Sequence, residues 1–160
     1  MLFRSQNMEI ITYVLQGALE HQDSLGNRSI IHAGDVQRMT AGTGIRHSEF
    51  NASATEPVHL LQIWIVPHTQ GLSPSYEEIH LGDRFQAAPS QDTEGSTALR
   101  LIASPEGRSG SVTLHQAVDL WVARLGHAEA LSYELRPGRS VWLQVSQGKV
   151  VVNDRLLEAG

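Results

Sequence analysis

The sequence predicts an all-β protein, and three observations on its 160 residues support this fold class. Short apolar or alternating runs recur along the whole chain. Turn-forming Gly, Asn, Asp, Ser and Pro residues separate these runs at the spacing typical of a β-sandwich or β-barrel. No segment shows a long amphipathic helical period. We therefore expect strands nearly throughout.

The first half contains several strand signals and one helix signal. A hairpin is expected within residues 18–35, because Asp23, Ser24, Gly26 and Asn27 supply its turn. The run "VHLLQIWIV" is apolar enough to predict a strand buried on both faces. One short helix is expected over "SYEEI", since a Ser-Pro pair precedes it and favours a helix start. The other expected strands are "MEIITYVLQG", "VQRMTAG" and "RHSEF".

The second half begins after a polar stretch rich in Gln, Asp, Ser, Pro and Gly, which predicts a linker over residues 81–97. Strand-like runs follow it: "LRLIAS", "SVTLHQ", "LWVARL", "ALSYEL", "SVWLQV" and "KVVV". The segment "WLQVSQGKVVVNDRLLEAG" also repeats the pattern of "YVLQGALEHQD…IIHAGDV". Two β-modules are predicted, over residues 1–80 and 98–160.

Composition limits the classes of function. The formal net charge of −5 argues against a nucleic-acid partner, which needs a basic surface. The chain has no cysteine, so disulfides and thiolate metal sites are excluded. No apolar run approaches the roughly 18 residues of a membrane span, and "MLFRSQNMEI" has no signal-peptide core. We expect a cytoplasmic protein that does not bind membranes.

The segment "AGTGIRHSEF" carries the clearest chemical signal. His47 and Glu49 lie two apart in a predicted strand, so their side chains project from the same face. Imidazole and carboxylate are ligands for divalent transition metals. The pair is therefore either half of a metal site or a polar pair within a barrel, bonded to water or to each other.

Several blocks together resemble the pirin family of the cupin superfamily. These are "MEIITYVLQGALEHQDSLGN", "AGDVQRMTAGTGIRHSEFN" and "EPVHLLQIWIVP", followed by "LRLIASPEGRSGSVTLHQ" and "LRPGRSVWLQVSQGKV". The resemblance runs over nearly all of residues 7–160. It implies a bicupin, in which two antiparallel jelly-roll β-barrels pack together. Relatives extend further at both ends, so we expect both modules of this chain to be incomplete.

The resemblance also implies a metal site with a defect. Pirin-like proteins bind iron or another divalent metal through three histidines and one glutamate, and His47 and Glu49 match two of these ligands. The other two ligands belong to a His-Pro-His-Arg block. Phe3 and Ser5 stand at those positions here. We expect low occupancy by Fe, Ni, Mn or Zn and no other cofactor.

Two functions remain open at this stage. The first is a pirin-like cupin whose quercetin 2,3-dioxygenase activity is weak or lost, and which binds a small aromatic ligand in its barrel or a protein partner. The second is an active metal-dependent dioxygenase on flavonol-type substrates with a rearranged ligand set. In that case Glu49 is a metal ligand and a proton acceptor.

The remaining candidates have structural interpretations. His21 and His32 are possible third ligands, but both flank a hairpin turn and are expected at the surface. The three tryptophans are expected to pack in the core, and Glu77 and Glu78 to lie on a solvated helical turn. Uncovered strand edges predict a homo-oligomer, because unpaired edges favour association.

Overall fold

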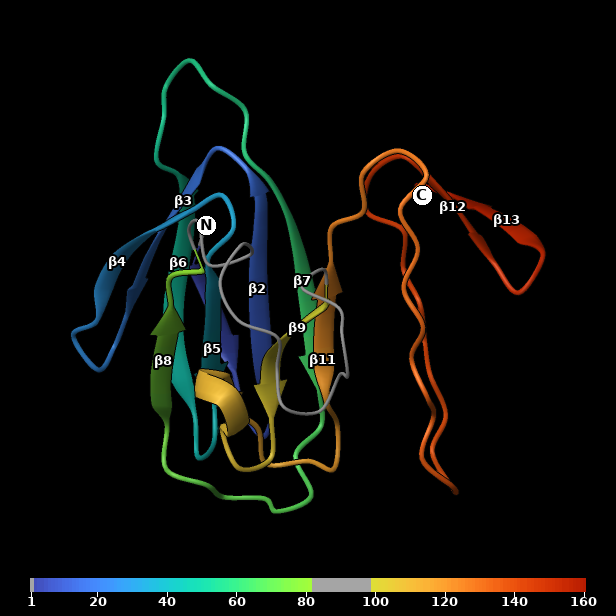
Figure 1. Cartoon of the computed structure of the whole chain (residues 1–160). Coiled ribbons are helices and arrows are strands. Elements are labelled where there is room, and N and C mark those ends of the chain that lie inside the picture. The colour runs from blue at the N-terminus through green and yellow to red at the C-terminus, as the bar shows by residue number, and fades with distance from the viewer. Residues whose placement is uncertain (1, 82–98) are drawn as a thin grey trace.

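The structure, a computed structural model, describes residues 2–81 and 99–160. In this part of the chain regular structure is almost entirely β (Figure 1), which confirms the predicted fold class. One short 3₁₀ turn, η2, covers Arg108–Gly110. The strands are β1 (Leu2–Ser5), β2 (Glu9–Gln16), β3 (Ala18–Asp23), β4 (Arg28–His32), β5 (Val36–Thr40), β6 (Ile45–Asn51), β7 (His59–Ile65), β8 (Ser75–Ile79), β9 (Leu99–Ser104), β10 (Val112–Thr113), β11 (Leu120–Ala123), β12 (Lys149–Val152) and β13 (Arg155–Glu158).

Two four-stranded antiparallel sheets build the first module. Sheet 1 has the order β1-β6-β3-β4, and sheet 2 has the order β7-β2-β5-β8. The predicted hairpin is formed by β3 and β4. Apolar layers close both ends of the space between the sheets: Ile10, Met39, Ala41 and Ile45 at one end, Val14, Leu19 and Ile31 at the other. The layer between them is polar.

The second module packs on the opposite face of sheet 2. Successive side chains of a strand point to opposite faces, so Ile11 and Tyr13 of β2 face away from the first-module interior. They belong to a cluster with Val36, Leu81, Ile102, Ala103, Val112 and Leu114. Strands β9, β10 and β11 form the three-stranded sheet that carries much of this cluster. The middle strands of sheet 2, β2 and β5, are therefore buried on both faces, and this explains why β2 is apolar over nearly its whole length.

A buried carboxylate ties the two modules together. Glu9 of β2 is fully buried, and its oxygens accept hydrogen bonds from the His115 main chain at 2.7 Å and from Thr40 Oγ1 at 2.9 Å. The His115 ring nitrogen Nδ1 lies 2.8 Å from the same carboxylate. Because buried charge is stable only when it is paired, these contacts stabilise the docking of residue 115 on sheet 2.

The C-terminal part has few strands. β12 and β13 form an antiparallel hairpin that projects away from the first module (Figure 1), and it corresponds to the β3–β4 hairpin of the internal repeat. The strands expected at "ALSYEL" and "SVWLQV" are absent from the described structure, which is a correction. The equivalent segment in the first copy, β2, pairs with β5 and β7, and no described strand pairs with residues 140–145.

Three other expectations from local sequence pattern are wrong. Residues Ser75–Ile79 form β8 and not a helix, because they pair with β5 along its whole length. Strand β7 is not buried on both faces, because each of its residues is half-buried or exposed and its Trp64 is 55% exposed. Trp142 is 88% exposed, so these two tryptophans are not core residues. Glu77 and Glu78 consequently lie on a strand.

The predicted linker falls almost entirely outside the described residues. Only Leu81 can be placed, and it is buried in the cluster between the modules. The proposed boundaries therefore remain a prediction. Among residues 2–81 and 99–160, no helix is long and apolar enough to cross a membrane.

Candidate functional site

The glycines of "AGTGIRHSEF" fix the start of β6. Gly42 has a φ of 48° and lies against the main chain of Leu72, where an added Cβ would come within 2.0 Å of the carbonyl oxygen. The next residue, Thr43, donates a main-chain hydrogen bond to the same oxygen at 2.9 Å. A side chain at position 42 would break this close approach, so glycine is required there. This turn sets the register in which His47 and Glu49 follow.

His47 and Glu49 point into the polar layer between the sheets. They share one face of β6, and the neighbouring strand β3 places His21 opposite Glu49 and Asp23 opposite His47. His47 is 3% exposed and His21 is fully buried. The expectation of a surface His21 is therefore wrong, because sheet 2 covers this face of the hairpin. His32 is exposed, as expected.

Four rings form a continuous row across this layer. Phe3 of β1 pairs with His47 in the sheet register, and the two rings stack with centroids 5.3 Å apart. His47 stacks in turn on His21 at 5.9 Å, and His21 lies 5.2 Å from the ring of Tyr76 on β8. Phe3 thus occupies the position beside His47 with an apolar ring.

A chain of hydrogen bonds holds the Glu49 carboxylate. Gln62 Nε2 donates to both carboxylate oxygens, at 3.2 and 3.0 Å, and Trp64 Nε1 donates to Gln62 Oε1 at 3.0 Å. The indole N–H can only donate, so it fixes the orientation of the Gln62 amide and turns its NH₂ group towards Glu49. Burial alone raises the pKa of Glu49, but contacts with His21 and Gln62 outweigh it and hold this pKa below its ordinary value.

Other polar atoms of the layer lack partners among the described residues. Within residues 2–81 and 99–160, Thr12 Oγ1, Gln37 Oε1 and His47 Nδ1 are buried without a hydrogen-bond partner. Gln37 Nε2 lies 3.3 Å from His21 Nδ1, and His21 Nε2 lies 3.5 Å from Asp23. Burial lowers the pKa of His47, and the nearby Glu49 opposes this shift only in part. A neutral His47 with an open ring nitrogen can act as a ligand or accept a hydrogen bond.

The residues present fit a divalent ion only in part. His47 and Glu49 are suitable donors, and His21 Nδ1 lies 3.9 Å from Glu49 Oε1. Yet His21 and His47 meet face to face, with an angle of 21° between their rings. Within the described ranges, no three His, Asp or Glu side chains are arranged to hold a metal ion. Phe3 cannot coordinate, and a neutral serine hydroxyl at position 5 is a weak ligand.

Sequence reasoning missed the half of the site that lies on sheet 2. Thr12, Gln37, Gln62 and Tyr76 come from the four strands of sheet 2. Gln62 contacts Glu49, and Gln37 and Tyr76 contact His21. A signal was present, because Thr12 interrupts the apolar residues of β2 and Gln37 lies in a strand that is buried throughout. Neither residue could be assigned to this layer without the pairing of β2 with β5.

Comparison with known proteins agrees with this architecture. Residues 4–65 match the family model described as Pirin, and residues 101–160 match the quercetinase C-terminal cupin domain. A quercetin 2,3-dioxygenase of Escherichia coli (strain K12) is 44% identical over 148 residues, which are 92% of this chain and 59% of that protein. A putative quercetin 2,3-dioxygenase of Pasteurella multocida is 44% identical over 154 residues, 95% of this chain and 61% of that protein.

Solved structures give the same result. The crystal structure of YhhW from E. coli superposes on this chain with a TM-score of 0.85 at 39% identity. The superposition covers 99% of this chain and 63% of the YhhW chain. A second structure of this bacterial pirin, in complex with nickel(II), has a TM-score of 0.84 at 40% identity and the same coverage.

The fold and both matched models place the chain in one family. It belongs to the pirin family of cupin proteins, whose quercetin 2,3-dioxygenase-like members match most of its length. The predicted resemblance is thereby confirmed. The chain spans about three fifths of the length of these curated relatives.

Proposed function

We propose that this chain is a pirin-type cupin with weakened divalent-metal binding, so that quercetin 2,3-dioxygenase activity is weak or lost. The observation that carries this proposal is the stack of Phe3 on His47. In the sheet register Phe3 stands directly opposite His47, where the family resemblance expects a ligand histidine. An apolar ring there removes a donor and occupies the space beside the remaining one.

The two retained ligands are too few for tight binding. Non-haem iron and related ions commonly need at least two histidines and one carboxylate. His47 and Glu49 supply two donors, and a third has to come from a side chain that already has other contacts. On this proposal the barrel acts as a binding module that receives a small aromatic ligand beside His47, Glu49 and Gln62.

One observation favours a second candidate, a dioxygenase with a rearranged ligand set. His21 is fully buried next to Glu49, and His47 Nδ1 has no hydrogen-bond partner in the part of the chain that the structure describes. Rotation of the two imidazoles would give two histidines and one carboxylate. A bound ion would supply the dioxygen chemistry, and the ionised Glu49 would accept a proton from a bound phenol.

Metal analysis distinguishes the two candidates. The protein is purified without chelator, incubated with Ni²⁺ or Fe²⁺, desalted and analysed for bound metal, alongside His47→Ala and His21→Ala. We expect well below one ion per chain, and quercetin turnover in air close to background. One ion per chain that is lost in both variants, with turnover of quercetin, would contradict the proposal and establish the rearranged site.

A further inference from the structure

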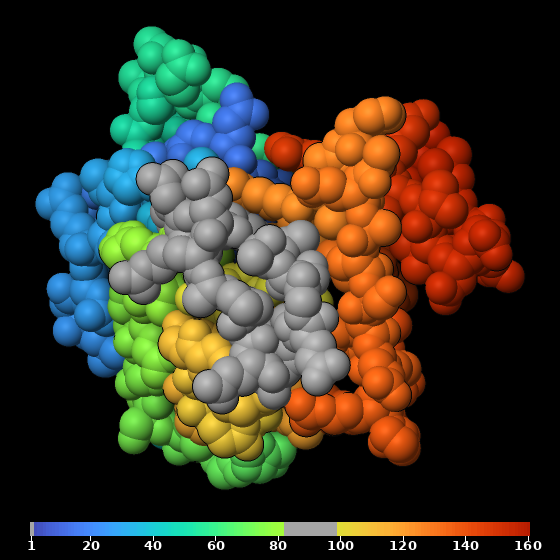
Figure 2. Space-filling model, in the orientation of Figure 1, coloured from blue at the N-terminus to red at the C-terminus, as the bar shows by residue number. Residues whose placement is uncertain are grey.

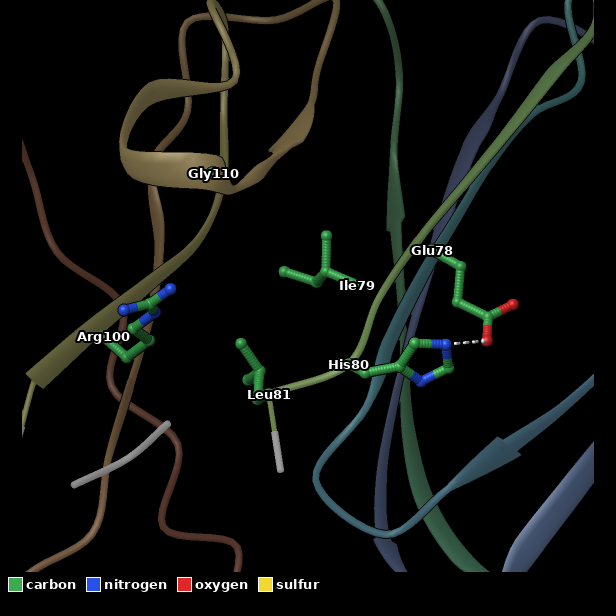
Figure 3. Close-up of a pocket in the computed structure, with 6 residues that line it drawn as sticks. All are labelled: Glu78, Ile79, His80, Leu81, Arg100 and Gly110. Carbon is green, nitrogen blue, oxygen red and sulfur yellow. Dashed lines mark ion pairs between the residues drawn. The ribbon is translucent and has the colours of Figure 1, made fainter. Parts of the chain in front are cut away.

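A cavity lies at the junction of the two modules, outside the first-module interior. It has a volume of about 260 Å³ and is lined by Glu78, Ile79, His80, Leu81, Arg100 and Gly110 (Figure 3). One water molecule takes about 30 Å³ in the liquid, so the cavity can hold an organic molecule. Arg100 enters from β9, and the residues opposite it belong to β8 and its continuation.

Arg100 places an unbalanced cation in this cavity. The residue is partly buried, its Nε is fully buried, and no described residue gives that Nε a hydrogen-bond partner or forms an ion pair with its guanidinium. A guanidinium is always charged in proteins, and a buried N–H donor without an acceptor is costly. An acceptor that comes from outside the described residues would remove this cost.

The acidic groups at the cavity already have other partners. Glu78 accepts hydrogen bonds from Ser29 Oγ at 2.5 Å and Tyr76 Oη at 2.6 Å, and its second oxygen lies 3.3 Å from His80 Nε2. The opposite ring nitrogen of His80 lies 3.0 Å from Asp35. Figure 3 shows Glu78 and His80 directed away from Arg100. They therefore do not neutralise it.

Two aliphatic side chains of the cavity lie on the side that faces Arg100. Ile79 and Leu81 point towards Arg100 in Figure 3, and both belong to the apolar cluster between the modules. A ligand in this space meets one cationic donor group and two aliphatic side chains. Such a site matches a molecule with one anionic end and a short aliphatic body.

We propose that this cavity binds a small aliphatic carboxylate, with its carboxylate on the Arg100 guanidinium and its hydrocarbon part on Ile79 and Leu81. A planar guanidinium binds a carboxylate through two parallel N–H···O bonds. The site is separate from the polar layer that contains His47 and Glu49. It needs no metal, so the test of this site is independent of the test of the proposed function.

Hexanoate is the probe, and hexanamide is its neutral counterpart. Titration of the full chain is followed by NMR, through the main-chain amide of Gly110 and the methyl groups of Ile79 and Leu81. We expect saturable shifts with a Kd of about 1 mM for this fragment-sized ligand. Hexanamide should bind at least tenfold more weakly, because it cannot form the charged bidentate pair.

Variants test whether Arg100 is the residue that binds hexanoate. Arg100→Gln should weaken hexanoate binding at least tenfold, and Arg100→Lys should retain part of it. Arg155→Gln removes an equal charge from the exposed β13 and should change the Kd less than twofold. The methyl spectrum of each variant reports whether it is folded. Absence of saturable shifts at Gly110, or equal binding by hexanamide or by Arg100→Gln, would overturn the proposal.

Discussion

Phe3 and His47 stack with ring centroids 5.3 Å apart and an angle of 24° between their planes. The contact joins β1 to the strand that carries both retained ligand candidates. It connects a sequence difference to a structural consequence, because the residue that cannot coordinate is also the one that covers the imidazole face. Ser5 lies two residues along β1, on the same face of the strand.

Restoring the two histidines should restore metal binding. In the double variant Phe3→His/Ser5→His, imidazoles stand at both replaced positions and join His47 and Glu49. We expect the affinity for Ni²⁺, measured by calorimetric titration, to rise at least a hundredfold, because a four-ligand site replaces a two-ligand site. Leu2→His is the matched control, since position 2 lies on the opposite face of β1. Equal gains in the control and the double variant would show that the register is wrong.

Loss of Gln62 should raise the pKa of Glu49. Gln62→Leu removes the amide that donates to both carboxylate oxygens, while burial continues to disfavour the charge. The pKa is measured by titration of the side-chain carboxyl carbon in NMR. Trp64→Phe should raise it less, because the amide remains but loses the donor that orients it. An unchanged pKa in Gln62→Leu would show that Gln62 does not stabilise the carboxylate.

The lowered pKa of Glu49 also predicts how the stability of the chain depends on pH. The folded-state pKa of Glu49 lies below its ordinary value. The ionised group therefore contributes stability above the unfolded-state pKa, and this contribution is lost as the pH falls through the folded-state pKa. We expect Gln62→Leu to lose less stability than the wild type on acidification in urea-unfolding measurements. A steeper loss in the variant would contradict the sign of the shift.

Removal of Glu9 should destabilise the chain. Glu9→Ala deletes a buried carboxylate and leaves Thr40, His115 and the main chain of residue 115 without their acceptor. Breaking a buried pair in this way costs about 3 kcal/mol of unfolding free energy. Glu106→Ala removes a carboxylate from an exposed ion pair and should change stability by less than about 0.5 kcal/mol. Similar effects in both variants would show that Glu9 does not anchor the second module.

The sequence was sufficient for features that depend on local pattern. Turn residues located the β3–β4 hairpin, and strand alternation placed His47 and Glu49 on one face. The sequence was insufficient where contact with a strand distant in sequence determines the burial or the conformation of a residue. His21 is adjacent to a turn in sequence, but it is buried because Gln37 and Tyr76 cover it from sheet 2. The helix expected over residues 75–79 rested on a Ser-Pro signal, and pairing with β5 outweighs that local preference.

Association through the C-terminal hairpin is the last prediction. Val151 and Leu156 are cross-strand partners, so they present adjoining apolar side chains, and they are 64% and 59% exposed. Trp142 is 88% exposed. Apolar surface left in water costs about 25 cal/mol per Å², and strand edges readily pair with other strands. A second copy can cover identical edges across a two-fold axis, so we propose a homodimer.

Light scattering coupled to size-exclusion chromatography measures the mass in solution. The wild type should elute at twice the chain mass at micromolar concentration, and Val151→Lys/Leu156→Lys should elute as a single chain, because charge on the hairpin opposes its burial. Leu25→Lys, an exposed apolar position in the β3–β4 turn, is the control and should remain dimeric. A wild-type mass of one chain that does not change with concentration would exclude the dimer. A dimer that persists in the double variant would place the interface elsewhere on the molecule.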